Sequence, residues 1–244
     1  MCLLSSENFH TIQDPSRVLS LCPAGETRIV VYIREHAAHI VSWYQQAIQS
    51  RNTAMSLDEF IEHHTLSLSG MIDGWVQAYG IENVIVRLYE RPALRDGDIV
   101  ADFCHLLDPR LARNLGGQTV ASNPSIAGNL LFLKRVLNCF LTKEESQSVA
   151  DEVAGLSGLD PTFSGKIAVG QNTINRIKFL CREDRAQLNE RFSLKMKPRT
   201  TPIEGTAYPD YSRLAEDLKL IRKASREKKF KLESYLERMH EVIA

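Results

Sequence analysis

Two side chains near the start of the chain have the types and the spacing to hold an anion. Arg34 directly follows the apolar run "IVVYI" at 29–33, and Ser42 lies eight residues further on. A guanidinium can donate two parallel hydrogen bonds to one phosphate, and a serine hydroxyl can donate a third. The alternative is that Arg34 forms a structural ion pair, as arginines at strand ends often do.

The surrounding elements would place these two groups at the mouth of a sheet. The segments "RIVVYI" at 28–33 and "NVIVRLY" at 83–89 are typical of buried strands, and "CLLSS" at 2–6 is a candidate third strand. In open α/β sheets, ligands bind beyond the carboxyl ends of the strands, where Arg34 lies. The next segment predicts a helix with Ser42 opposite its apolar stripe, on the side nearest Arg34.

Most of the remaining chain has helical patterns. Ser56 and Glu59 have the spacing of a capping box, and Gly80 is a candidate end for a helix at 68–79. Asp98 is a candidate cap for a short helix whose apolar face carries Ile99, Phe103 and Leu106. Strands alternating with helices predict an α/β fold with a large helical share.

Composition changes suggest four regions. They are an α/β core at 1–120, a helical subdomain at 121–194, a linker at 195–210 and a long amphipathic helix at 211–244. Such a helix would extend about 45 Å or more, longer than the core beside it. It either folds back on its own domain or forms a homodimer through residues 211–243.

Bulk properties describe an ordinary globular protein. The 244 residues carry 30 Lys and Arg against 30 Asp and Glu, so no overall field recruits nucleic acid or a membrane. Five scattered Cys without a C-x-x-C pair suggest a cytoplasmic protein, and no apolar run predicts a membrane span. The His pairs at 36/39 and 63/64 lack a third ligand of defined spacing, so no metal is expected.

The segment "RIVVYIREHAAHIVSWYQQ" resembles the 3′-phosphate-binding element of sulfotransferases that use 3′-phosphoadenosine 5′-phosphosulfate (PAPS). In that family a strand ends in Arg and the next helix carries a Ser eight positions later. The segments "LLSSENF", "MIDGWVQAYGIENVIVRLYER" and "GDIVADFCHLL" resemble bacterial carbohydrate-sulfotransferase-like proteins on either side of it. The likeness covers residues 1 to about 108, is thin to about 138 and is absent from the last fifty.

The resemblance implies a partial P-loop-type, three-layer parallel sheet and a set of site residues. Arg34 and Ser42 match the clamp on the 3′-phosphate of PAPS or of its product PAP. Tyr89 matches a tyrosine near the nucleotide, and Glu7 lies where relatives place the base that deprotonates the acceptor hydroxyl. The implied reaction is transfer of a sulfuryl group to a carbohydrate or a similar acceptor, without a metal.

The family's Gly-rich loop for the 5′-phosphosulfate is missing from this sequence. The segment "SGKIAVGQNT" at 164–173 follows a helical region and lacks the Gly-Lys-Ser/Thr order, so it is expected to be an ordinary loop. Either the start codon is placed too late or the gene is shortened, so that Met1 is an internal residue of an ancestral enzyme, or the shortened chain is a real product. In the second case it is a non-catalytic scaffold that oligomerises through its C-terminal helix, or a remnant that binds the nucleotide without turnover.

Overall fold

A computed structural model of the chain describes residues 3–6, 9, 12, 14–64, 67–108, 110 and 125–243, with the backbone alone at 239–243. The chain forms two units. Unit 1 comprises Met1–His36, Leu66–Gln118 and Lys178–Arg199, and unit 2 comprises Ala37–Thr65, Thr119–Ile177 and Thr200–Ala244. Composition suggested four regions that are each continuous in the sequence, whereas each of the two units combines three separate segments of the chain.

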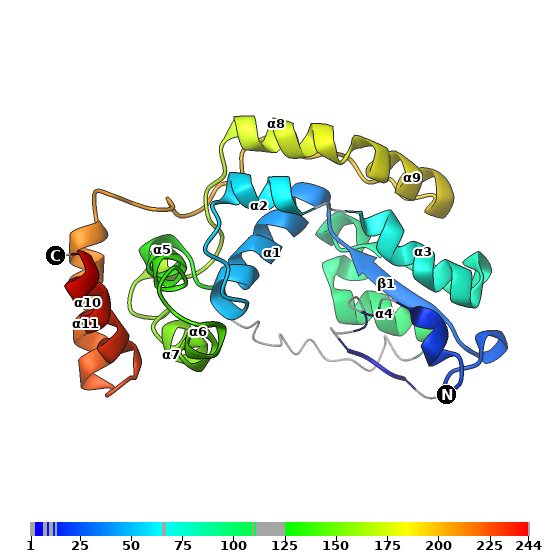
Figure 1. Cartoon of the computed structure of the whole chain (residues 1–244). Coiled ribbons are helices and arrows are strands. Elements are labelled where there is room, and N and C mark those ends of the chain that lie inside the picture. The colour runs from blue at the N-terminus through cyan, green and yellow to red at the C-terminus, as the bar shows by residue number, and fades with distance from the viewer. Residues whose placement is uncertain are drawn as a thin grey trace. The chain divides into compact units, whose positions relative to one another are not determined.

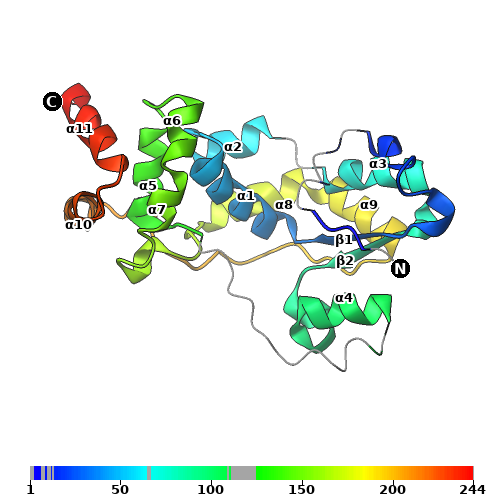
Figure 2. The same ribbon diagram turned by 90° about the horizontal axis from the view of Figure 1, so that it is seen from below.

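Unit 1 is built on two parallel strands, β1 (Ile29–Ile33; Figure 1) and β2 (Val84–Leu88), which are both labelled in Figure 2. Both were predicted from their β-branched runs. Ile29 pairs with Val84 and Ile33 with Leu88, so the carboxyl ends of the strands are level. Residues 3–6, the described part of the candidate third strand, have no regular secondary structure. The fold is mixed α/β and mostly helical, with this two-stranded parallel sheet.

Helices lie on both sides of these strands (Figure 2). One side packs against α3 (Leu68–Tyr79) and α9 (Arg182–Phe192), and the shared core includes Ile33, Val86 and Leu88 from the strands and Trp75 and Leu188 from the helices. The other side carries Tyr32 and Arg87, which contact α4 (Ile99–Leu107). Alternating side chains of one strand therefore serve two different layers.

Local signals define where α3 and α4 begin and end. Gly80 follows α3 with φ at +83°, a conformation that costs glycine little, and its N–H donates to the carbonyl of Val76. The Asp98 carboxylate caps α4 by accepting from the amides of Val100 and Ala101. Both ends were predicted.

The inward face of α4 differs from the prediction. Ile99, Phe103 and Leu106 are only half-buried, whereas Asp102 is 1% exposed. Its carboxylate accepts from the Tyr32 hydroxyl at 2.7 Å and from two nitrogens of Arg87. A hydrogen-bonded ion pair therefore holds α4 on the sheet, because an unpaired buried carboxylate would be costly.

Unit 2 is helical. Its helices are α1 (His36–Ser50, from Ala37 onward), α2 (Leu57–His63), α5 (Gly128–Leu137), α6 (Lys143–Ser148), α7 (Ala150–Ala154), α8 (Gln171–Leu180, as far as Ile177), α10 (Leu214–Glu227) and α11 (Leu232–Ile243). The predicted stripe of α1 is confirmed: Ala37, Val41, Tyr44 and Ile48 are all at most 3% exposed. The predicted capping box of α2 is also present.

The C-terminal segment forms two helices, so the prediction of one long helix at 211–244 is wrong. The break falls at 228–231, where Lys229 has φ at +55° and the amide of Phe230 donates to the carbonyl of Ser225. Ile221, Leu232 and Leu236 are buried, and both helices pack on α5 within unit 2. Three residues of the apolar stripe that suggested a dimer are therefore covered within unit 2, and the homodimer through residues 211–243 stays a prediction.

The predicted linker at 195–210 is partly built into the two units. Met196 is buried in the core of unit 1. In unit 2, the amides of Val169 and Ile203 each donate to the other residue's carbonyl at 3.0 Å, and the amide of Thr206 donates to the carbonyl of Lys166 at 2.8 Å. This pairing also fixes the segment at 164–170, which is a loop in the structure as expected.

Candidate functional site

The level carboxyl ends of β1 and β2 bring together two of the predicted site residues. The amide of Tyr89 donates to the carbonyl of Ile33 at 2.7 Å, which carries the strand pairing one residue further. Arg34 and Tyr89 thus leave the sheet side by side. The guanidinium carbon of Arg34 lies 4.6 Å from the centroid of the Tyr89 ring, and both side chains are exposed.

The charge of Arg34 is available to a ligand. Among the residues that the structure describes, no carboxylate lies within 4.0 Å of this guanidinium. The structural ion pair considered from the sequence is therefore not formed within this part of the chain. A tyrosine face attracts and orients a cation but does not neutralise it. The five N–H donors keep the geometry that a phosphate needs.

The other two predicted residues are not joined to this pair. Ser42 is exposed on α1, opposite the buried stripe, as predicted. It belongs to unit 2 and Arg34 to unit 1, so their convergence on one ligand stays a prediction. Glu7 lies outside the described residues, and its assignment as the base stays a prediction too.

A buried histidine, His36, follows Arg34 by two residues in the sequence. His36 is 0% exposed, and its Nε2 lies 2.8 Å from Oδ2 of Asp184 on α9. The second ring nitrogen, Nδ1, is buried and has no hydrogen-bond partner in the described part of unit 1. The carboxylate therefore fixes the orientation of this ring.

Asp184 is the centre of a network that joins three elements of unit 1. Its Oδ1 accepts from the amide of Ser69 at 3.0 Å, from the Ser69 hydroxyl at 2.6 Å and from the Ser67 hydroxyl at 3.1 Å. Burial alone would raise the pKa of this carboxyl, but the hydrogen bonds from His36 and Ser69 outweigh it and hold the pKa below its usual value. The network fixes the corner after β1, on which the position of Arg34 depends.

Sequence reasoning missed Asp184 and Asp102. Asp184 had no local signal, because its partner His36 is 148 residues away and α9 is polar on most of its surface. Asp102 did have one: it lies on the same helical face as Ile99 and Leu106, where a carboxylate needs a partner. Burial alone would raise the pKa of the Asp102 carboxyl, but the hydrogen bonds from Arg87 and Tyr32 outweigh this effect and hold the pKa below its usual value.

The other histidines whose side chains the structure describes lie in aromatic or helical contacts. His39 and His64 each contact the ring of Trp43, and His64 stacks on Phe60 at 4.1 Å between centroids. Within the described ranges, no three His, Cys, Asp or Glu side chains gather so that they could hold a metal ion. The same part of the chain has no helix long and apolar enough to cross a membrane.

Comparisons with known proteins add one distant relative. The chain is similar to an uncharacterized protein of Archaeoglobus fulgidus, with 26% identity over 117 residues. The match covers 46% of this chain and 30% of the relative, so it spans less than a third of that protein's length. No family profile and no solved structure match the chain.

Proposed function

We propose that the chain is a sulfotransferase-like protein that binds the 3′-phosphate of PAP or PAPS at the carboxyl edge of unit 1. The observation that carries this proposal is the exposed Arg34 guanidinium, which lies on the Tyr89 ring with no carboxylate partner among the described residues. An exposed cation beside an aromatic face suits a nucleotide, which has both an anionic ester and a planar base. The same two residues matched the family's pattern.

Each matched residue has a role in the proposed complex. Arg34 donates to two oxygens of the 3′-phosphate, and the family resemblance assigns a third hydrogen bond to Ser42. The Tyr89 ring packs against the guanidinium. Asp184 holds the corner that follows Arg34 in the sequence, through its contact with His36. Transfer would move the sulfuryl group in line onto a hydroxyl of a carbohydrate or similar acceptor, with Glu7 accepting the proton of that hydroxyl.

Nucleotide binding and catalysis are separable in this proposal. Stabilising the 5′-phosphosulfate in the transition state needs several further donors, which the family supplies from its Gly-rich loop. A chain that binds PAP but transfers no sulfuryl group would be a nucleotide-binding remnant, and a chain that does both would be an enzyme. Titration with PAP tests the first step, and transfer of labelled sulfate from PAPS to carbohydrate acceptors tests the second.

Replacing Arg34 by Ala is expected to weaken PAP binding about 10- to 150-fold. A charge-assisted hydrogen bond contributes roughly 1.5–3 kcal/mol, and 1.4 kcal/mol corresponds to a factor of ten. Isothermal titration calorimetry with PAP measures the loss. Adenosine 5′-monophosphate lacks the 3′-phosphate, so we expect it to bind the variant and the wild type equally.

Arg28→Ala is the matched control, because Arg28 is an exposed arginine at the opposite, amino end of β1. Its loss changes the net charge equally and should leave PAP binding within about twofold, since the ligand contacts only the carboxyl edge. Equal losses in both variants would mean that PAP responds to net charge alone. Wild-type protein that releases no heat with PAP would refute the proposed function.

A further inference from the structure

The α10–α11 hairpin concentrates the positive charge of the chain. Residues 219–238 contain eight Lys and Arg against three Glu, whereas the other 224 residues contain 22 Lys and Arg against 27 Asp and Glu. The segment runs from the middle of α10 around the turn at 228–231 and into α11. All of its side chains belong to unit 2, so the charge lies on one unit of the protein.

The arginines of this hairpin form ion pairs, within the hairpin or with α6. Nε of Arg226 lies 2.6 Å from Oε1 of Glu233, and Nε of Arg222 lies 3.2 Å from the same oxygen, so both guanidinium groups tie α10 to α11. Arg238 of α11 pairs with Glu145 of α6 at 3.1 Å. These guanidinium groups are therefore not free to clamp one phosphate.

The lysines are the available charges. Lys219, Lys228, Lys229 and Lys231 are exposed, and no carboxylate of the described chain lies within 4.0 Å of their ammonium groups. Lys223 has a long contact with Glu227 at 3.9 Å, and both side chains are largely exposed. Lys229, at +55° in φ, turns the chain so that three of these lysines lie at the tip.

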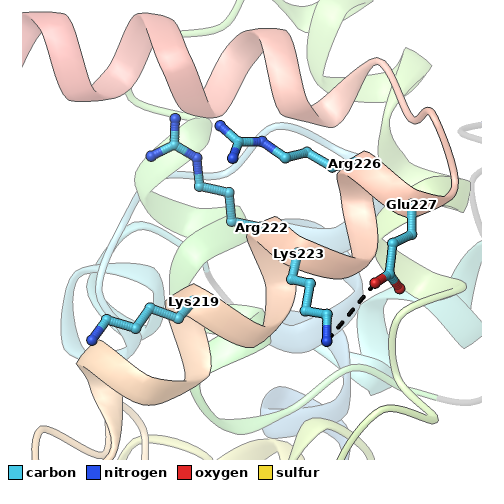
Figure 3. Close-up of a pocket in the computed structure, with 5 residues that line it drawn as sticks. All are labelled: Lys219, Arg222, Lys223, Arg226 and Glu227. Atoms are coloured by element: carbon cyan, nitrogen blue, oxygen red, sulfur yellow. Dashed lines mark ion pairs between the residues drawn. The ribbon is translucent and has the colours of Figure 1, made fainter.

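The surface along α10 is an open hollow (Figure 3). It has a volume of about 420 Å³ and is lined by Lys219, Arg222, Lys223, Arg226 and Glu227, all from one helix. Figure 3 shows Lys219 and Lys223 away from α11, and Arg222 and Arg226 directed toward it. A hollow on a single helix does not enclose a small ligand, so it suits contact with an extended surface.

The chemistry of the available groups favours a diffuse anionic surface over nucleic acid. Ammonium groups on flexible stems act as hydrated point charges, which suit many anions at once. Nucleic-acid binders add free arginines or free aromatic platforms. Here the Phe230 ring lies under the Lys228 ammonium at 5.7 Å, and the Tyr235 ring lies under Arg238 at 5.4 Å.

We propose that the lysines at 219, 228, 229 and 231 dock the α10–α11 hairpin on a membrane surface rich in anionic phospholipid headgroups. Clustered lysines are attracted to such a leaflet without insertion of the chain. The contact would hold unit 2 at the surface. It does not depend on the nucleotide site proposed for unit 1.

The test is sedimentation of the full chain with lipid vesicles. Wild-type protein should sediment with vesicles of mixed phosphatidylcholine and phosphatidylglycerol at low salt, and stay in solution with phosphatidylcholine alone. Changing Lys228, Lys229 and Lys231 together to Glu should reduce binding to the mixed vesicles at least tenfold. Raising the salt concentration should release the wild type, because the attraction is screened.

The control variant carries Lys166→Glu, Lys195→Glu and Lys197→Glu, three exposed lysines outside the hairpin. It has the same net charge as the hairpin variant and should bind mixed vesicles like the wild type. Circular dichroism of both variants checks that they are folded. Equal loss in both variants, or no binding of the wild type, would overturn the proposal. Binding of duplex DNA that depends on the hairpin lysines, without vesicle binding, would overturn it in favour of nucleic acid.

Discussion

Replacing Asp184 by Ala is expected to destabilise unit 1 by about 3 kcal/mol or more, a large share of the 5–15 kcal/mol that holds a typical domain folded. The substitution removes one acceptor group that serves His36, Ser67 and Ser69 together. The imidazole of His36, at 0% exposure, would then have neither nitrogen satisfied. Buried polar groups without partners each cost roughly 1–3 kcal/mol.

Each unit carries its own fluorescent reporter for this experiment. The chain has two tryptophans: Trp75 lies in the core of unit 1, and Trp43 lies in unit 2. In a Trp43→Phe background, urea unfolding followed through Trp75 reports on unit 1. The Asp184→Ala variant should show a lower midpoint with an unchanged slope, which indicates a change in stability and not in the unfolded state.

Asp73→Ala is the matched control, because Asp73 pairs with Arg191 between the same two helices, α3 and α9. Both side chains of that pair are at least 30% exposed, and exposed pairs contribute about 0–1 kcal/mol. Asp184→Asn keeps an acceptor for Ser69 and should lie between the two. If Asp184→Ala costs no more than Asp73→Ala, the network does not fix this corner.

The elements that the sequence predicted correctly are those specified by neighbouring residues. The α1 stripe repeats every turn, and the Ser56 and Glu59 pair is complete within one turn, so both are readable from a short window. The strands were also readable, because their apolar runs are short and end in polar residues. The adjacency of Arg34 and Tyr89 came from the family resemblance, since periodicity does not give strand pairing.

The errors concern interactions between distant segments. Apolar residues of the C-terminal segment fall on one helical face from 214 to 243, and this pattern predicted a single helix. Polar residues at Ser225 and Lys228 or Lys229 interrupt the face near its middle. In the structure the turn at Lys229 divides the segment into two shorter helices, and both of them bury apolar residues against α5. The pairing of His36 with Asp184 is likewise a tertiary contact that no local pattern announces.

The buried Lys134 of α5 gives the second large expected effect, on the pH dependence of stability. This side chain is 0% exposed and has no carboxylate within 4.0 Å in the described chain. Its ammonium donates to Oδ1 of Asn138 at 2.5 Å and to Oγ of Ser146 at 2.6 Å. Burial lowers the pKa of Lys134 to about 8, because the charged form loses its hydration.

The sign of the pH effect follows from where the proton is held. In the unfolded chain the lysine keeps its proton up to its ordinary pKa near 10.5, whereas the folded protein releases it from about pH 8. Between these values the unfolded state binds more protons, so the free energy of unfolding rises with pH. Below pH 8 both states are charged, and the folded state bears the full cost of the buried ammonium. The whole effect amounts to about 3 kcal/mol at most.

Lys134→Met should therefore raise the free energy of unfolding at pH 7 by roughly 1–3 kcal/mol. Methionine, like lysine, has an unbranched side chain. Although the substitution removes the ammonium, the groups that accepted its hydrogen bonds keep other partners. The Ser146 hydroxyl still donates to Oδ1 of Asn138 at 2.8 Å, and the Asn138 amide still donates to the carbonyl of Ile48 in α1 and to that of Thr53 just after this helix. The polar contacts that hold α5 to α1 and α6 remain.

The measurement is urea unfolding of the parent protein and Lys134→Met from about pH 7 to pH 9.5, both in a Trp75→Phe background, followed by circular dichroism and by Trp43 fluorescence. The difference between the two proteins should shrink as the pH rises, because the parent protein sheds its buried charge. Staying below pH 10 avoids an opposite effect: burial raises the pKa of Tyr208 and Tyr32, which lowers stability once tyrosines ionise in the unfolded chain. A difference that is constant with pH would show that Lys134 is not charged in the folded protein at pH 7.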